Sequence, residues 1–138
     1  MVRDVKFIVI HCTATPQHTK VESIQRYWRE VLKWKSAGYH YIVEPTGMLR
    51  QLTDESKIAN GVRGYNRESI HISYIGGVDS NNKPFNNMTL SQSETMKALI
   101  DALKVKYPNA EVLGHRDFPN VRKACPCFDV KSWLQDCD

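Results

Sequence analysis

Residue types that bind metal ions or carry out chemistry occur close together near the carboxyl end of the chain. The segment GHRDFPNVRKACPCFD, residues 114–129, contains His115, Lys123, Cys125 and Cys127. It also contains two prolines and has neither a helical nor a strand period, which indicates a loop that can fold back on itself. A histidine, a lysine and a cysteine held together in this way can form part of a functional site, which needs further residues from elsewhere in the chain.

The candidate partner from the other end of the chain is His11, which ends the apolar segment VKFIVIH. This β-branched run is typical of a strand that is covered on both faces. His115 likewise follows a short strand-like segment, EVLG. Because ligand sites in open α/β sheets gather beyond the carboxyl ends of the strands, we expect the two imidazoles to lie side by side. Cys125 can return to the same point through the irregular loop.

Two imidazoles and one thiolate form a known ligand set for zinc. A zinc ion with three protein ligands keeps its fourth tetrahedral position open for water, which is the arrangement of a catalytic site. There the ion lowers the pKa of the water to about 7 and polarises a carbonyl group. His11, His115 and Cys125 therefore predict a Zn²⁺ site that carries out hydrolysis.

The other cysteines leave alternatives open. The chain has four cysteines, which are too few and too unevenly placed for a disulfide framework. Both Cys125 and Cys127 could bind the metal ion, although thiols on either side of a proline do not easily point at the same ion. Alternatively, Cys127 could form a disulfide with Cys12 or Cys137.

The amino-terminal half is predicted to contain a helix and a hairpin. Thr19 and Glu22 have the spacing of a capping box, which would start a helix that ends at Gly38. Residues 39–43 and 48–52 are then predicted to form the two strands of a hairpin. A stripe along one face of the helix is expected to be apolar: Ile24, Tyr27, Trp28, Val31 and Leu32.

The carboxyl-terminal half is predicted to add a strand at residues 69–75, a helix, and a short strand at residues 111–114. Thr89 and Gln92 form a capping box at the start of this helix, and Pro108 ends it. Helices and strands mixed in one unit predict an α/β (mixed α+β) fold. We expect a central mixed β-sheet of about five strands flanked by helices.

Length and composition are those of one folded domain, residues 1–138. The chain has 41% hydrophobic and 25% charged residues, which argues against disorder. Its net charge of +4 favours anionic surroundings such as nucleic acid, lipid headgroups or acidic cell-wall polymers. The aromatic residues follow core-like periods instead of alternating with lysine and arginine, so no nucleic acid partner is expected. We expect the protein to be a monomer.

No segment of the sequence predicts a membrane span or a cleavable signal. No stretch approaches the ~18 consecutive apolar residues that a membrane span needs. The apolar run near the amino terminus is too short for a signal peptide and is interrupted by His11. We therefore expect cytoplasmic synthesis without a signal peptide.

Five short blocks of sequence resemble the signature of one enzyme family. They are HCTAT (11–15), GYHY (38–41), GYN with SI (64–66 and 69–70), GHRD (114–117) and KACPCFD (123–129). In this order they resemble the zinc-dependent N-acetylmuramoyl-L-alanine amidases of phage-lysozyme type, which are relatives of the peptidoglycan recognition proteins. The resemblance spans nearly the whole chain.

The resemblance implies a mixed sheet with flanking helices and a zinc ion held by His11, His115 and Cys125. It also implies hydrolysis of the amide between the lactyl group of N-acetylmuramic acid and the L-alanine of the peptidoglycan stem. Such an enzyme would act on the cell wall in the periplasm or outside the cell. The alternative is a non-catalytic peptidoglycan-binding module of the recognition-protein type. That module would lack the thiolate, so Cys125 argues against it.

The resemblance assigns catalytic roles to Tyr39 and Lys123. Lys123 can place its ammonium group against the oxyanion that forms when the carbonyl is attacked. Tyr39 can position the attacking water and pass a proton toward the leaving amine. If Tyr39 opens a strand, alternation puts Tyr39 and Tyr41 on one face and His40 on the other, where His40 packs or supports the site.

Two positions depart from the family pattern. Family members often have a small residue where this chain has His71, and a histidine near Gly61, so the contacts to substrate are expected to differ. His71 alternates with isoleucines on the polar side of its strand, where it could line a groove, but we expect a surface role for it. Asp117 or Asp129 is expected to accept the second ring N–H of a metal-bound histidine. Basic residues are expected to border the substrate groove: Lys57, Arg63, Arg67 and Arg122.

Overall fold

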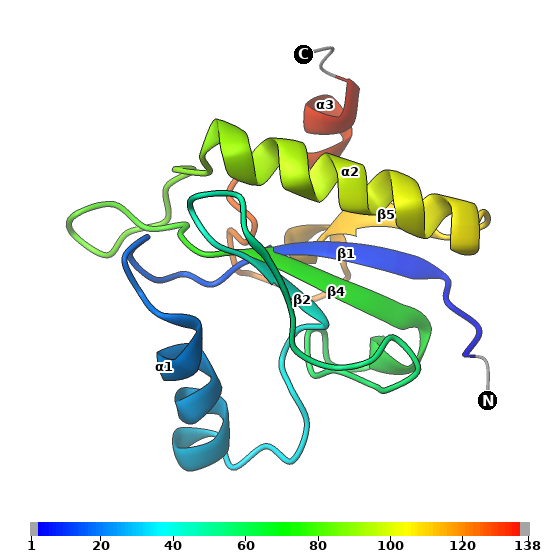
Figure 1. Cartoon of the computed structure of the whole chain (residues 1–138), viewed down its shortest axis with the longest axis horizontal. Helices are drawn as coiled ribbons and strands as arrows, with labels where there is room; N and C mark the ends of the chain where they lie inside the picture. Colours follow the sequence, from blue (N-terminus) through cyan, green and yellow to red (C-terminus); the bar gives the residue numbers. More distant parts are fainter. Residues whose placement is uncertain (1–2, 136–138) are drawn as a thin grey trace.

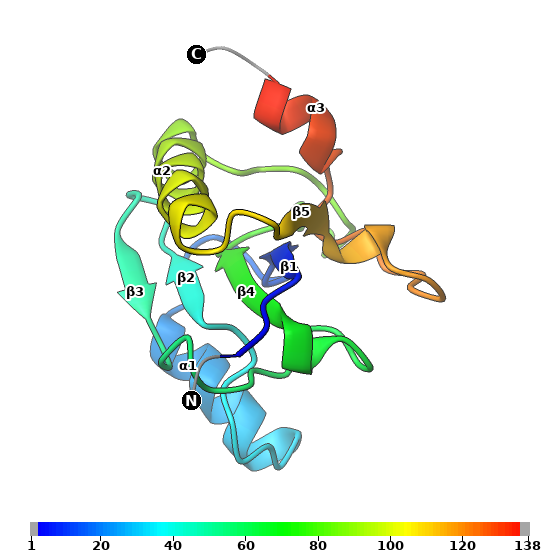
Figure 2. The ribbon, with the colours of Figure 1, turned by 90° about the vertical axis from the view of Figure 1, so that its right-hand side faces the viewer.

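A mixed sheet of five strands forms the centre of the computed structural model, which describes residues 3–135 (Figure 1). Figure 2 shows the strands in the order β3-β2-β4-β1-β5. Their bounds are β1 Phe7–Cys12, β2 Tyr41–Val43, β3 Leu49–Gln51, β4 Ser69–Tyr74 and β5 Glu111–Gly114. The predicted mixed α/β fold with about five strands is confirmed.

Parallel pairing brings the carboxyl ends of four strands to one edge of the sheet. β2, β4, β1 and β5 run parallel, whereas β3 is antiparallel to β2. β1 lies between β4 and β5, and residues 8–12 are buried, as expected for a strand covered on both faces. Residues that follow the ends of β1 and β5 are therefore neighbours, which is the placement that a ligand site in such a sheet requires.

The helix α2, Leu90–Lys106, covers one face of the sheet together with the short helix α3, Val130–Gln135 (Figure 1). The indole N–H of Trp133 donates a hydrogen bond to Ser93 Oγ at 2.8 Å and ties α3 to α2. Apolar side chains of the sheet and of α2 form the core of this layer: Ile8, Ile10, Ile70, Ile72, Met96, Ile100 and Leu103.

The opposite face of the sheet is partly covered by α1, Val21–Arg26, which continues as a π-helical turn, η1, Tyr27–Val31. Because side chains alternate along a strand, Val9 and His11 point to this face while Ile8 and Ile10 point to α2. A second apolar cluster joins the helical segment to the sheet: Val21, Ile24, Trp28, Ile42 and Ile75. Within residues 3–135, no helix combines the length and the apolar character needed to cross a membrane.

The start of α1 differs from the prediction. Its N-cap is Lys20, which makes no side-chain hydrogen bond to the helix, so the predicted capping box of Thr19 and Glu22 is wrong. The backbone N–H of Thr19 donates to Pro16 O at 3.2 Å, which places Thr19 in the preceding turn. The helical segment also ends at Val31 and does not continue to Gly38.

The predicted apolar stripe of this segment is correct only for Ile24 and Trp28. Tyr27, Val31 and Leu32 are 52%, 61% and 37% exposed. The Leu32 N–H donates to Tyr27 O at 3.1 Å, a bond that spans five residues in place of four. This π-helical turn shifts the side chains away from the 3.6-residue period on which the prediction rested.

The first strand of the hairpin begins at Tyr41 and not at Tyr39. Tyr39 therefore lies outside the strand, and the predicted alternation of Tyr39, His40 and Tyr41 is wrong. Tyr39 packs with the cluster around Trp28, whereas Tyr41 belongs to the core beneath α2. The two tyrosines face different layers, which leaves Tyr39 on the same side of the sheet as His11.

The capping box at the start of α2 is confirmed. Gln92 N–H donates to Thr89 Oγ1 at 3.0 Å, and Thr89 N–H donates to Gln92 Oε1 at 2.9 Å. Thr89→Ala removes the first of these bonds and the bond that Thr89 Oγ1 donates to Pro45 O at 2.8 Å, and we expect it to lower the free energy of unfolding by about 1–2 kcal/mol. Urea unfolding followed by circular dichroism measures the loss. Thr89→Ser keeps the hydroxyl and is the control; equal losses in both variants would contradict the capping role.

Candidate metal centre

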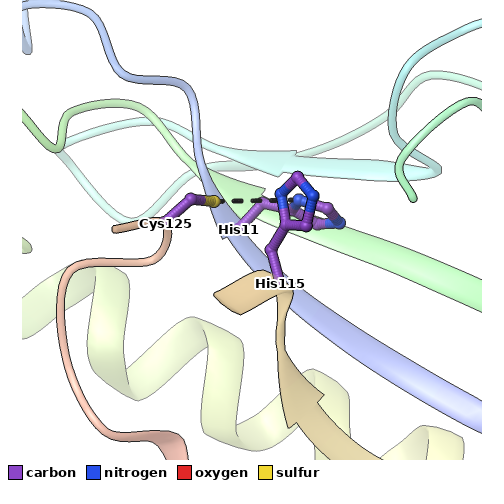
Figure 3. Close-up of side chains that lie close together, drawn as sticks. All are labelled: His11, His115 and Cys125. Carbon is purple, nitrogen blue, oxygen red and sulfur yellow. Dashed lines mark hydrogen bonds between the residues drawn. The ribbon is translucent and has the colours of Figure 1, made fainter. Parts of the chain in front are cut away.

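Three ligand-type side chains converge at the carboxyl edge of the sheet. One potential ligand atom from each of His11, His115 and Cys125 lies within 4.8 Å of the other two (Figure 3). The distance from His11 Nδ1 to Cys125 Sγ is 3.8 Å, and the ring centroids of the two histidines are 4.8 Å apart. His11 and Cys125 are buried and His115 is half-buried, so the group lies at the inner end of a cleft.

Local geometry explains why these residues meet. β1 and β5 pair with Ile10 opposite Gly114, so the next residues, His11 and His115, leave the two strands side by side. A Cβ on Gly114 would lie 2.9 Å from Pro126 Cδ, which shows how closely the carboxyl-terminal loop approaches β5. Cys125 O accepts from Arg116 N–H at 2.9 Å, which fixes the returning loop.

The donor set and its spacing fit zinc. With bonds of about 2.0 Å to nitrogen and 2.3 Å to sulfur, a tetrahedral zinc ion holds its ligand atoms about 3.3–3.6 Å apart. The 3.8 Å between His11 Nδ1 and Cys125 Sγ is close to that value. Burial lowers the pKa of His11 well below its ordinary value, with smaller contributions from nearby His71, His115 and Lys123. Burial and then the charge of Lys123 lower the pKa of His115 to about 4, so both imidazoles are neutral at pH 7 and can donate a lone pair.

Cys12 and Cys127 lie close to this group but face each other. Their Sγ atoms are 4.0 Å apart, both thiols are free, and Cys127 Sγ also donates to Gly77 O. Burial, followed by the neighbouring Cys12, raises the pKa of Cys127 to about 11, so it is a neutral thiol at pH 7. Cys127 is not part of the ligand group found within residues 3–135. The alternative with Cys137 lies outside the described residues.

The ligand group opens into a cleft with a volume of about 820 Å³. Aromatic side chains of Trp28, Trp34 and Tyr65 form part of its walls. Of the four basic residues expected at the groove, Arg63 and Arg122 line the cleft, and Lys57 and Arg67 do not. None of the described residues that line it is acidic, so the cleft is electropositive and suits an anionic ligand.

The two predicted catalytic residues also line the cleft. The ring of Tyr39 lies 5.0 Å from that of His11, and its hydroxyl donates to Cys12 O at 3.3 Å. Burial, and then the nearby thiol groups of Cys125 and Cys12, raise the pKa of Tyr39, so its hydroxyl keeps its proton at neutral pH. Lys123 is exposed at the mouth of the cleft, close enough for its charge to lower the pKa of His11 and His115.

The surface role favoured for His71 from the sequence is wrong, because His71 belongs to the site. It is fully buried, and its Nδ1 lies 2.9 Å from His11 Nε2. β1 and β4 pair with Val9 opposite His71, so His71 points to the same face as Val9 and His11. The predicted alternation of side chains along β4 was correct, but the face that carries the polar side chains points into the site and not to solvent. The signal that could have located His71 was the pairing of β1 with β4, because side chains of adjacent parallel strands share one face of the sheet.

Neither predicted carboxylate supports a ligand imidazole. Asp117 Oδ2 accepts from Gly114 N–H at 2.8 Å, and Asp129 Oδ2 accepts from the backbone and hydroxyl of Ser132. Both aspartates therefore stabilise local turns near the ends of short helical segments. The residue that contacts the second ring nitrogen of His11 is His71.

A His₂Cys group in a cleft at the carboxyl edge of a mixed sheet is typical of a metal-dependent hydrolase. The family model described as N-acetylmuramoyl-L-alanine amidase matches residues 1–128. The endolysin of Klebsiella phage KP32 is 34% identical over 129 residues, covering 93% of this chain and 84% of the relative. The endolysin of Escherichia phage T7 is 34% identical over 130 residues, with the same coverage.

The fold also matches a solved structure. The Ph2119 endolysin from the Thermus scotoductus MAT2119 bacteriophage Ph2119 superposes with a TM-score of 0.83 and 24% identity, covering 98% of this chain and 86% of that one. The chain belongs to the N-acetylmuramoyl-L-alanine amidase family. It is therefore an amidase, and the prediction of an enzyme in preference to a non-catalytic binding module is confirmed.

Proposed function

We propose that this amidase uses a Zn²⁺ ion held by His11, His115 and Cys125 to cleave the amide between N-acetylmuramic acid and the L-alanine of the peptidoglycan stem. The observation that carries the proposal is the convergence of the three ligand atoms within 4.8 Å at the inner end of the cleft. When bound there, zinc would supply the Lewis acidity that activates water and polarises the scissile carbonyl.

The surrounding residues support the remaining steps. The ammonium group of Lys123 stabilises the negative charge that develops on the carbonyl oxygen. The hydroxyl of Tyr39 keeps its proton at neutral pH and lies beside His11, so it can orient the attacking water and donate toward the leaving amine. The cleft gives a substrate access to these groups, whereas His11 itself is buried.

The electropositive cleft supports a peptidoglycan stem as the ligand. Stem peptides carry free carboxylates, and Arg63 and Arg122 offer guanidinium groups that pair with carboxylates in a bidentate manner. The relatives from phages KP32 and T7 are endolysins. We propose that this chain likewise acts on a bacterial cell wall, and that it does so as a monomer.

Digestion of purified cell walls tests the proposed reaction. Cleavage at the lactyl amide releases a new α-amino group on L-alanine, which dinitrophenylation detects, and creates no new reducing sugar ends. We expect new alanine amino groups together with stoichiometric zinc by atomic absorption. Reducing ends without new alanine amino groups would identify a glycosidase and refute the proposal, as would full activity in protein free of zinc.

Tyr39→Phe tests the proton donor. The change removes only the hydroxyl and keeps the ring that packs on His11 and Trp28. We expect kcat to fall by about 10²-fold, the lower end of the range for acid–base catalysis, with zinc content unchanged. Steady-state release of stem peptide from a soluble muropeptide measures it. Tyr27→Phe, which removes an exposed hydroxyl, should leave kcat unchanged; equal kcat in both variants would remove Tyr39 from the mechanism.

A further inference from the structure

The two ring nitrogens of His11 face different partners. Nδ1 lies 3.8 Å from Cys125 Sγ, on the side where the ligand group converges. Nε2 lies 2.9 Å from His71 Nδ1. A metal ion shared with Cys125 would therefore bind Nδ1, and this requires Nδ1 to be free of a proton while Nε2 carries one.

The positions of the protons on His71 and His11 follow from Asn66, which contacts the other ring nitrogen of His71. Asn66 Oδ1 accepts from the backbone N–H groups of Gly61 at 3.1 Å and Val62 at 2.7 Å. Because a backbone N–H can only donate, the atom that they contact is the amide oxygen. This oxygen also lies 2.8 Å from His71 Nε2, so Nε2 must be the donor in that contact.

The direction of the hydrogen bond between Asn66 and His71 fixes the direction of the hydrogen bond between His71 and His11. His71 is fully buried, no carboxylate contacts it among the described residues, and the proton that its contacts require lies on Nε2, facing Asn66 Oδ1. With that proton on Nε2, Nδ1 of His71 can only accept. His11 Nε2 must then be the donor, which leaves the lone pair of His11 Nδ1 on the side of Cys125.

We propose that His71 is a positioning residue of the metal centre. The hydrogen-bonded series Asn66, His71, His11 fixes the tautomer and the ring orientation of His11, so that Nδ1 faces the metal ion. This inference rests on the proposed zinc site. His71 takes the role that a carboxylate or a backbone carbonyl usually takes next to a metal-bound histidine.

The ring of His71 is packed between His40 and Gly61. Its backbone N–H donates to His40 Nδ1 at 3.0 Å, and the two rings stack with centroids 6.0 Å apart. On another side lies Gly61, where any Cβ would overlap the His71 ring. The absence of a side chain at position 61 therefore provides the space that the imidazole at position 71 occupies.

Two variants of similar size separate the hydrogen bond from packing. His71→Asn keeps an acceptor close to the position of Nδ1, whereas His71→Leu fills the space without one. We expect His71→Leu to weaken zinc affinity by about 10–100-fold, measured by competition with a chromophoric chelator, and His71→Asn to restore most of it. His18→Ala, which removes an exposed histidine, should bind zinc as the parent does. Equal affinities for the Asn and Leu variants would overturn the proposal.

Nitrogen-15 NMR of the zinc-loaded parent protein provides a readout that needs no variant to fold. We expect His11 Nε2 to carry a proton and to show a coupling across the hydrogen bond to His71 Nδ1. Metal bonded to His11 Nε2, or a proton on His71 Nδ1, would overturn the inference even if the enzyme is zinc-dependent. A parent protein that binds no zinc would instead refute the proposed function.

Discussion

Replacement of Cys125 by alanine is expected to abolish zinc binding and amide hydrolysis together. The variant leaves only His11 and His115 as ligands, and two imidazoles do not hold zinc in a three-ligand catalytic site. Cys125 Sγ also accepts the backbone N–H of Cys12 at 3.1 Å, so the change leaves a buried donor without its partner. We therefore also expect a loss of about 1–3 kcal/mol in the free energy of unfolding.

Atomic absorption of purified protein and release of alanine amino groups from cell walls measure the two effects on Cys125→Ala. Cys127→Ala is the matched control, because Cys127 lies two positions later in the same loop and faces Cys12 and Gly77. We expect that variant to keep both zinc and activity. Zinc retained in Cys125→Ala, or lost to the same extent in Cys127→Ala, would replace the His₂Cys assignment by one in which Cys127 is a ligand.

The three proposed ligands could be predicted from the sequence because local features mark their positions. His11 and His115 each follow a short apolar run, and the parallel sheet brings the ends of these runs together without further information. Cys125 lies in a segment whose prolines and lack of period already indicated a returning loop. The prediction needed only that β1 and β5 be neighbours, not their exact register.

The errors in the predicted site have two origins, which are the pairing of strands distant in the sequence and the bonding of side chains to nearby backbone. Whether the polar face of β4 meets solvent or the ligand group depends on its pairing with β1, and the register Val9 opposite His71 is not contained in either segment alone. Asp117 was expected to accept the second ring N–H of a metal-bound histidine, but its carboxylate accepts from the backbone N–H of Gly114. Short polar side chains commonly bond to nearby backbone in this way.

The error in the amino-terminal helix has a different origin. An apolar stripe predicts which face is buried only if the period stays at 3.6 residues. The π-helical turn at Tyr27–Val31 changes that period, and it places Trp28 against Gly38 and the cleft. The side chains that follow, including Val31, turn to solvent. A Cβ at Gly38 would lie 2.7 Å from the Trp28 ring, so this arrangement depends on glycine at that position.

Replacement of Lys123 by alanine is expected to slow the reaction while leaving the metal centre intact. Lys123 is exposed and is not a ligand, so zinc content and the free energy of unfolding should match the parent. Loss of one group that stabilises an oxyanion typically lowers kcat by about 10²–10³-fold, or about 2.7–4 kcal/mol of transition-state stabilisation. Because this interaction strengthens only as charge develops, we expect KM for a soluble muropeptide to change little.

Arg122→Ala is the matched control for Lys123→Ala, because it removes the adjacent positive charge, which also lines the cleft. A charge that only attracts the anionic stem contributes equally to the ground state and the transition state, so Arg122→Ala should raise KM and leave kcat unchanged. Lys123→Arg keeps the charge but changes the geometry of the donors, and we expect it to recover part of the lost kcat. If Lys123→Ala changed KM alone, as expected for Arg122→Ala, Lys123 would belong to substrate attraction and the oxyanion would need another donor in the cleft.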